Sequence, residues 1–467
     1  MNPTRVYRLL LALLPAACSD PVVSSAGSAG GTSSGSDTGS TTIGGTPATV
    51  GDASSSDTTS GPSASSTDGG SQGDSSSSST PICGDGQVDG DEECDDGTAK
   101  DGGACRADCR LAFEVLGTRS FHAGGEEGTA LAFDRGGVAW VTARASGKEP
   151  NADDPLVLSA DAMGVLEPAW NPSTASDDGL YSIAIHPSGD LVVAGETNPG
   201  GNSDGMLARV RQDGTVVWSL QYDGSDSGSA IADEDYATDV AVNAAGEVFA
   251  AYTIREIGEA EDIRIVKYDE EGADQWDWTY SVSPNESDGT RDLVLAPNGD
   301  LLFCAVATDF DVGRNAIVGR LSTAGELLAL ETLEHYDIRS LALDDEGITL
   351  LGPRWLERRS LDLQTVIFSD TQAGFDSGGA ITSYNGGIVV AGRFDAAEQR
   401  PRQMFVGAWS YDGAPLWSDV YAGGALAHAA LAHDLAFALD GTLWVVGTVF
   451  TEASDADVVI RRYQILE

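Results

Sequence analysis

The chain has 467 residues, and its 73 acidic against 26 basic side chains give a formal net charge of -47 at pH 7. A field of this sign repels phosphate backbones and anionic lipid headgroups, so binding to nucleic acids or to a membrane surface through charge is disfavoured. Five histidines and six cysteines leave few side chains for a transition-metal site. The composition fits a strongly solvated surface that attracts cations or basic partners.

Residues 1–18 have the features of an export signal. A positively charged start is followed by the apolar run 9–14, and the small residues Ala16 and Ala17 precede Cys18. The run is too short to span a bilayer. The segment resembles a bacterial lipoprotein signal, which implies that Cys18 is acylated and becomes the mature N-terminus. The chain would then reach the membrane through this lipid alone, and the alternative is plain secretion.

The next segment, residues 19–81, consists mostly of Ser, Gly, Thr, Asp and Ala and has no aromatic, Lys or Arg residue. Such a composition cannot bury enough apolar surface to offset the entropy that is lost on ordering. We therefore expect a disordered tether, with an r.m.s. span of about 40–50 Å for a flexible coil.

Residues 82–110 contain four cysteines and almost no hydrophobic side chains; the cysteines are Cys83, Cys94, Cys105 and Cys109. A piece this small cannot fold around a core, so we expect disulfides to order it, with three pairings open. A zinc site with four cysteine ligands is the alternative, although the spacing lacks paired CxxC knuckles. The string CGDG…EECDDG…C…C resembles the cysteine-rich repeat of exported myxobacterial proteins.

A four-strand pattern repeats through residues 111–467. The clearest copy, residues 178–224, has four short stretches of alternating apolar residues with tight turns after the first and third. The first turn recurs in seven units, mostly at intervals of 48–57 residues. We therefore predict an all-β fold, a seven-bladed β-propeller. The units resemble bacterial beta-propeller repeats of the SBBP kind, a likeness that implies the fold rather than an activity.

The two ends of the repeat region complement each other. The seventh unit has strand patterns at 432–438, 443–449 and 458–463 but no fourth one. Residues 111–121, which precede the first unit, have the pattern of an unpaired fourth strand. We predict that this stretch pairs with 458–463, closes the ring and removes its free edges.

Three tryptophans and one cysteine occupy noticeable places in the repeats. Trp218, Trp276 and Trp417 each follow a turn glycine by four residues, which resembles the tryptophan-docking element of quinoprotein propellers. Packing between neighbouring blades is the simpler interpretation of large aromatics at equivalent positions. Cys304 lies in an apolar run and is expected to be a buried, inert thiol.

The densest group of histidines is His428 and His433, followed by Asp434. A metal pair, or a base with its orienting partner, is conceivable there. The sequence supplies neither a third ligand nor a nearby nucleophile, so we predict no catalytic residue.

Two of the four connections in each unit are long and mostly acidic: those between the second and third strands, and those between successive units. In an up-and-down blade both kinds leave by the same face, where we expect a protein or polysaccharide ligand to bind. Hard cations relieve the repulsion between grouped carboxylates, so acidic residues of two neighbouring loops are candidate calcium ligands. They are Asp223, Asp226, Asp233, Glu234, Asp235, Glu259, Glu261 and Asp262.

These features predict an exported cell-envelope protein, lipid-anchored in the outer membrane or at the cell surface, otherwise periplasmic or secreted, that presents a monomeric propeller as a binding module. Apart from calcium, we expect no cofactor. The alternatives are an enzyme that uses the funnel of the propeller, such as a polysaccharide lyase or hydrolase, and a structural spacer. Arg, His, Tyr and carboxylate side chains converging at the funnel mouth would favour the enzyme.

Overall fold

The computed structural model describes residues 7, 8, 94, 105, 106, 108 and 110–466, the last range without 147–152, 173–176, 199–201, 225–233, 256–259, 283–286, 310–312, 396–401, 425–426 and 453–454. Cys18, the predicted tether and most of the cysteine-rich segment lie outside these residues. No helix in the described part is long and apolar enough to cross a membrane.

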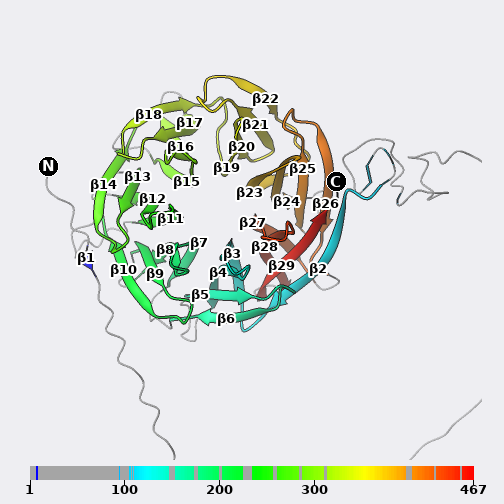
Figure 1. The fold of residues 1–467 in the computed structure, drawn as a ribbon, viewed down its shortest axis with the longest axis horizontal. Coiled ribbons are helices and arrows are strands. Elements are labelled where there is room, and N and C mark those ends of the chain that lie inside the picture. Colours follow the sequence, from blue (N-terminus) through cyan, green and yellow to red (C-terminus); the bar gives the residue numbers. More distant parts are fainter. Residues whose placement is uncertain are drawn as a thin grey trace, which may run out of the picture. The chain divides into compact units, whose positions relative to one another are not determined.

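Seven antiparallel blades form a ring, which confirms the predicted propeller (Figure 1). Numbered along the chain, each blade has four strands, and the sheet of blade 2 gains the two-residue strand β1 (Tyr7–Arg8) beside its outermost strand. The innermost strands pack against one another around the ring, each on the first strand of the next blade.

The strands of blades 1 to 4 have the following bounds: β3 (Glu126–Phe133), β4 (Ala139–Ser146), β5 (Asp153–Ala160) and β6 (Leu166–Trp170); β7 (Gly179–Ile185), β8 (Leu191–Thr197), β9 (Asp204–Val210) and β10 (Val216–Tyr222); β11 (Tyr236–Val242), β12 (Val248–Arg255), β13 (Glu261–Tyr268) and β14 (Asp274–Tyr280); β15 (Gly289–Leu295), β16 (Leu301–Asp309), β17 (Gly313–Leu321) and β18 (Leu327–Thr332).

Those of blades 5 to 7 are β19 (Ser340–Leu343), β20 (Ile348–Gly352), β21 (Trp355–Arg359) and β22 (Val366–Asp370); β23 (Ser377–Tyr384), β24 (Gly387–Phe394), β25 (Gln403–Trp409) and β26 (Pro415–Tyr421); β27 (Ala429–Phe437), β28 (Leu443–Glu452), β29 (Asp455–Ile465) and β2 (Phe113–Phe121).

The tight turns lie at the positions predicted from the sequence. Short polar side chains stabilise them by accepting main-chain hydrogen bonds. In blade 1 the Asp134 carboxylate accepts hydrogen bonds from the main-chain N–H groups of Gly136 (2.8 Å) and Val138 (3.0 Å). Gly137 in the same turn has φ = 81°, which a side chain would disfavour. The side chain of Asn243 accepts equivalent bonds in blade 3. These Asx turns fix the register of the hairpins on the face that carries the tight turns.

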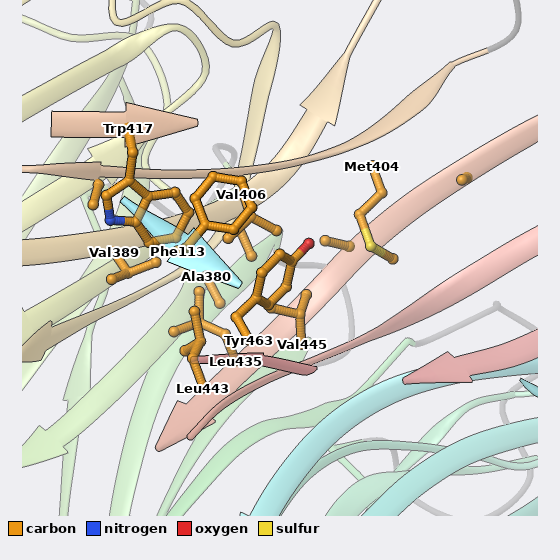
Figure 2. Packing of buried hydrophobic residues seen from close by; sticks show 14 of the residues in the cluster. Phe113, Ala380, Val389, Met404, Val406, Trp417, Leu435, Leu443, Val445 and Tyr463 are labelled. Carbon is orange, nitrogen blue, oxygen red and sulfur yellow. The ribbon is translucent and has the colours of Figure 1, made fainter. Parts of the chain in front are cut away.

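The ring is closed as predicted, by a strand from before the first blade. β2 pairs antiparallel with β29, from Phe113 opposite Ile465 to Phe121 opposite Val458. Phe113 is buried, and its ring centroid lies 4.8 Å from that of Trp417 and 5.7 Å from that of Tyr463 (Figure 2). The closing strand is therefore held both by a β ladder and by an aromatic cluster shared between blades 6 and 7.

The tryptophans pack between blades, so the simpler interpretation of them is confirmed. The indole N–H of Trp218 donates to the carbonyl of Glu270 in the next blade (3.0 Å), and that of Trp276 donates to Thr323 (3.1 Å). A Cβ at Gly272 would lie 3.0 Å from the Trp218 ring, so the glycine permits this contact. Blade 7 has no turn between its third and fourth strands, because β2 comes from elsewhere in the chain. Trp417 packs on Phe113 instead.

One disulfide of the cysteine-rich segment is defined. Cys94 and Cys105 are bonded with an S–S distance of 2.02 Å, whereas Cys83 and Cys109 lie outside the described residues. Cys304 is fully buried in blade 4, and burial raises the pKa of its thiol well above the usual value. This thiol is therefore inert, as its apolar sequence context predicted.

Candidate functional site: a polar pocket on the long-loop face

Because the strands of each blade alternate in direction, the connections leave the ring by two different faces. The loops between second and third strands and between successive blades share one face, which we call the long-loop face. The tight first-to-second and third-to-fourth turns share the other, the short-turn face. Residues at the start of first and third strands and at the end of second strands therefore lie at the long-loop face.

Buried aspartates brace the loops of this face from directly before the innermost strands. The two carboxylate oxygens of Asp235 accept hydrogen bonds from the N–H groups of Gly224 and Arg255, both at 2.7 Å. Asp288 does the same in the next blade with Val282 (2.7 Å) and Thr308 (2.8 Å). Each of these carboxylates ties the incoming loop to the end of the second strand.

The predicted calcium ligands are only partly brought together. Asp223 and Asp235 do meet, and Asp204 at the start of β9 completes a group whose carboxylate oxygens lie within 4.8 Å of one another. Burial raises the pKa of Asp235 to about 7 and that of Asp204 to about 6. Because both oxygens of Asp235 already accept main-chain hydrogen bonds, this carboxylate has a structural role without a cation.

The other predicted ligands have different surroundings. Glu234 accepts a hydrogen bond from the phenol of Tyr236, Asp262 is buried at the start of β13, and Glu261 faces the pocket described below. Asp226, Asp233 and Glu259 lie outside the described residues.

A β-bulge recurs at the same position of six blades, and in blades 3, 4 and 7 a carboxylate follows it on the inner strand; we call these three carboxylates the belt. Each belt carboxylate accepts the N–H of a leucine in the following blade: Asp239 from Leu293 (2.7 Å), Asp292 from Leu341 (2.8 Å) and Asp434 from Leu131 (2.7 Å). Burial raises the pKa of Asp434 to about 7, and burial together with Asp292 raises that of Asp239. The belt joins neighbouring blades.

The histidine group contributes no acid–base pair to this face. Asp434 accepts hydrogen bonds from the N–H groups of Leu131 and Leu435, both at 2.7 Å. Burial lowers the pKa of His433 to about 4, and its Nε2 is buried without a hydrogen-bond partner among the residues described. An imidazole that stays neutral over the physiological range is suited to packing rather than to proton transfer.

A pocket of about 290 Å³ opens on the long-loop face between blades 3 and 4. Hydroxyl groups form much of its wall; they belong to Tyr236, Thr238, Thr253, Ser287 and Thr308. Three charged side chains complete the polar lining: Arg291, Arg314 and Glu261. Arg291 occupies the bulge of the innermost strand β15, and Arg314 lies near the start of β17, so both belong to blade 4.

The arginines of the pocket belong to a larger charged cluster around Asp337. This buried carboxylate lies 3.4 Å from a guanidinium nitrogen of Arg314, 3.0 Å from one of Arg339 and 4.0 Å from Nε of Arg291. Burial lowers the pKa of Arg291, and the neighbouring charges of Arg339 and Arg314 lower it further against the opposing effect of Asp337. The cluster therefore holds more positive than negative charge.

Asp337 differs in position and in partners from the other buried aspartates of this face. Asp235 and Asp288 directly precede their strands and accept an N–H from the end of the second strand. Asp337 lies three residues before β19, and its carboxylate is approached by the guanidinium groups of arginines.

The phenols near the pocket act as hydrogen-bond donors. Tyr236 donates to Glu234 at 2.7 Å, and Tyr181 donates to Glu196, which also receives a bond from Arg144. Burial and the adjoining carboxylates raise the pKa of both phenols well above the usual value. Neither phenol is poised to lose its proton near neutral pH.

Comparison with known proteins identifies no family. No protein-family model and no curated protein matches the chain. A solved protein of unknown function from Dyadobacter fermentans is 11% identical over 76% of this chain and 100% of that one, with a TM-score of 0.48. Another, from Bacteroides caccae, is 12% identical over 59% of this chain and 92% of that one, with a TM-score of 0.39. The resemblances to lipoprotein signals and to named repeats remain predictions.

Asp204 and the arginine cluster around Asp337 were not among the residues predicted from the sequence. Asp204 is equivalent to Asp154 and Asp262, since each lies six residues before the end of a third strand. Aligning the seven units on their strand ends would have shown this recurrence. The same alignment places Arg291 at the position of Thr238. An arginine at a position that carries a small polar residue in the preceding unit is the sequence signal that could have indicated the pocket.

Proposed function

We propose that the protein is an exported cell-envelope binding protein that holds a carbohydrate ligand in the pocket on its long-loop face. The observation that carries this proposal is the lining of the pocket, where hydroxyl and charged side chains from blades 3 and 4 converge around about 290 Å³. A space of this size suits one or two small polar units, and groups that both donate and accept hydrogen bonds suit a polyhydroxylated ligand.

The distribution of apolar side chains favours a carbohydrate over a protein partner. A stable protein interface usually has an apolar, often aromatic core within a buried area of about 1,200–2,000 Å². Among the residues described, most exposed large apolar side chains lie on outer strands or at the short-turn face. The long connections contribute Val282 and Tyr336, and Tyr336, 62% exposed, lies in the same loop as Asp337 and Arg339. A single exposed aromatic ring next to polar groups suits stacking on a sugar.

Binding is better supported than cleavage. Arginine, tyrosine and carboxylate groups do converge here, as an enzyme would require, but the nearby phenols have raised pKa values and donate to carboxylates. The carboxyl groups with a pKa near neutrality, Asp235 and Asp434, are engaged by main-chain N–H groups. None of these groups is free to act as a base on a bound sugar.

Replacing Tyr336 by alanine is expected to weaken binding of a neutral oligosaccharide at least tenfold, because the substitution removes the exposed stacking surface on the long-loop face. The matched control is Leu439→Ala, a side chain 73% exposed in a first-to-second turn of the short-turn face, which should leave affinity unchanged. The measurement is a glycan-array screen of the mature full-length chain, followed by calorimetric titration of the best oligosaccharide. If Leu439→Ala loses affinity and Tyr336→Ala keeps it, the ligand binds the short-turn face and the proposal is contradicted.

The proposal includes a lipid anchor at Cys18. Substitution Cys18→Ser is expected to move the protein from the membrane fraction to the soluble fraction of the cell envelope, since no other membrane attachment is proposed. Intact-mass analysis of the mature wild-type chain provides the check. A mature chain that begins beyond residue 18 contradicts the anchor without affecting the pocket.

A further inference from the structure

We infer that the pocket selects a ligand with a single carboxylate next to hydroxyl groups, such as an isolated or terminal uronic acid unit, and that Arg291 and Arg314 receive the carboxylate. This inference rests on the proposed function and names its ligand class. Arginine is the side chain whose planar fork of N–H donors matches a carboxylate, so its presence in a hydroxyl-lined pocket is informative.

The charge count around the pocket calls for an anion. Among the residues described, three guanidinium groups, those of Arg291, Arg314 and Arg339, face two carboxylates, that of Asp337 within the cluster and that of Glu261 in the opposite wall, which leaves an excess of one positive charge. This excess occurs in a chain whose overall charge is -47. Burial is the main cause of the lowered pKa of Arg291, with smaller contributions from Arg339 and Arg314, and a bound carboxylate would offset all three.

The geometry leaves donors free to receive that carboxylate. Nε of Arg291 has no hydrogen-bond partner in the described part of the chain and lies 4.0 Å from Asp337, while Nη1 of the same side chain donates to the carbonyl of Thr290 at 3.1 Å. Arg314 is 48% exposed at the pocket, and its closest approach to Asp337 is 3.4 Å, longer than a good charged hydrogen bond. Both side chains therefore reach the pocket with donor capacity unused.

The other polar residues that line the pocket indicate that the ligand carries hydroxyl groups next to its carboxylate. Glu261 lies in the wall contributed by blade 3, and a carboxylate can only accept hydrogen bonds, so it calls for hydroxyl donors on the ligand. The hydroxyl of Thr308 donates to the carbonyl of Ser287 and that of Thr253 accepts from the N–H of Thr290, and the remaining lone pairs of these oxygens can accept hydrogen bonds from sugar hydroxyls. A polyanion is a poor ligand, because its other charges would lie among the acidic loops of this face and be repelled.

The test is calorimetric titration of the mature full-length chain with glucuronate and, separately, with glucuronamide, which replaces the carboxylate by a neutral group of similar shape. We expect glucuronate to bind at least tenfold more tightly than glucuronamide. Arg314→Gln should abolish that difference. The matched control is Arg354→Gln, an arginine 67% exposed in a connection of the same face and paired with Asp376, which should preserve it. Circular dichroism verifies that both variants fold.

Other outcomes distinguish failure of the carboxylate inference from failure of the proposed carbohydrate binding. Equal affinity for the two sugars, or a preference that survives in Arg314→Gln, overturns the carboxylate inference. If neither sugar binds, the inference is also overturned, yet the proposed function stands as long as a neutral oligosaccharide binds and Tyr336→Ala weakens it. A polygalacturonate that binds more tightly per site than glucuronate contradicts selection of a single carboxylate.

Discussion

Deleting residues 111–121 is expected to lower the melting temperature of the protein by roughly 10 °C or more and to cause self-association. The deletion removes β2, which pairs with β29 over its whole length, and leaves the edge of β29 unpaired. It also removes Phe113 from the aromatic cluster that joins blades 6 and 7. Thermal melting and size-exclusion chromatography measure the two effects. Deletion of 19–81 should change neither, because that segment is predicted to be a tether.

A milder variant separates packing from closure. Phe113→Ala keeps the β2 ladder but removes a ring in contact with Trp417 and Tyr463, which should destabilise the fold by about 3 kcal/mol. Leu116→Ala, on the same strand but 38% exposed, should cost less than about 0.5 kcal/mol. Equal effects of the two substitutions in urea unfolding would show that the aromatic cluster does not hold the closing strand.

The propeller is expected to melt at a higher temperature near pH 5.5 than near pH 7.5. Burial raises the pKa of Asp204 to about 6 and those of Asp235 and Asp434 to about 7, compared with about 3.9 in an unfolded chain. Between these values the folded protein binds protons that the unfolded chain does not, so stability falls as the pH rises through the folded pKa values. Lower net charge at the acidic end acts in the same direction.

One histidine opposes this trend. Burial lowers the pKa of His433 to about 4, so below about pH 6.5 the unfolded chain binds its proton first and part of the gain is lost. The carboxyl groups outnumber it, and we expect a net gain on the order of a few kcal/mol, or roughly 5–10 °C. Differential scanning calorimetry at matched ionic strength measures it. A melting temperature that rises from pH 5.5 to pH 7.5 would contradict the proposed role of these carboxyl groups.

Two controls assign the pH effect to the buried carboxyl groups. Asp434→Asn keeps a polar group of the same shape and should flatten the pH dependence, whereas Asp345→Asn at an exposed position should not. Millimolar calcium should leave the curve unchanged if the carboxylates of Asp204, Asp223 and Asp235 bind no cation. A calcium-dependent rise near pH 7.5 would instead show that Asp204, Asp223 and Asp235 bind the cation.

The fold could be predicted from sequence because each blade repeats a local pattern. Alternating apolar residues, turn glycines and a constant spacing act within one unit, and the ring follows from stacking such units. Closure was predictable too, since a unit lacking its fourth strand requires one from elsewhere. The packing of Trp218 and Trp276 could also be predicted from the stacking of repeated units, because both lie at equivalent positions and pack on the turns of the next blade.

The candidate site could not be predicted in the same way, because it depends on contacts between units. Arg291, Arg314 and Arg339 are separate in sequence and meet only around Asp337. The surroundings of the acidic loop residues depend on such contacts as well. Charge alone does not reveal that the oxygens of a carboxylate such as Asp235 already have main-chain partners.

The most direct test of the central claim is a crystal structure of the full-length mature chain with the oligosaccharide that it binds most tightly. We expect sugar density between blades 3 and 4, within hydrogen-bonding distance of Thr253 and Arg314. A larger hollow of about 420 Å³ on the short-turn face, lined by Tyr384, Trp417 and Arg106, provides the alternative location. Density there, with the pocket between blades 3 and 4 free of sugar, would contradict the assignment of the long-loop face as the functional one.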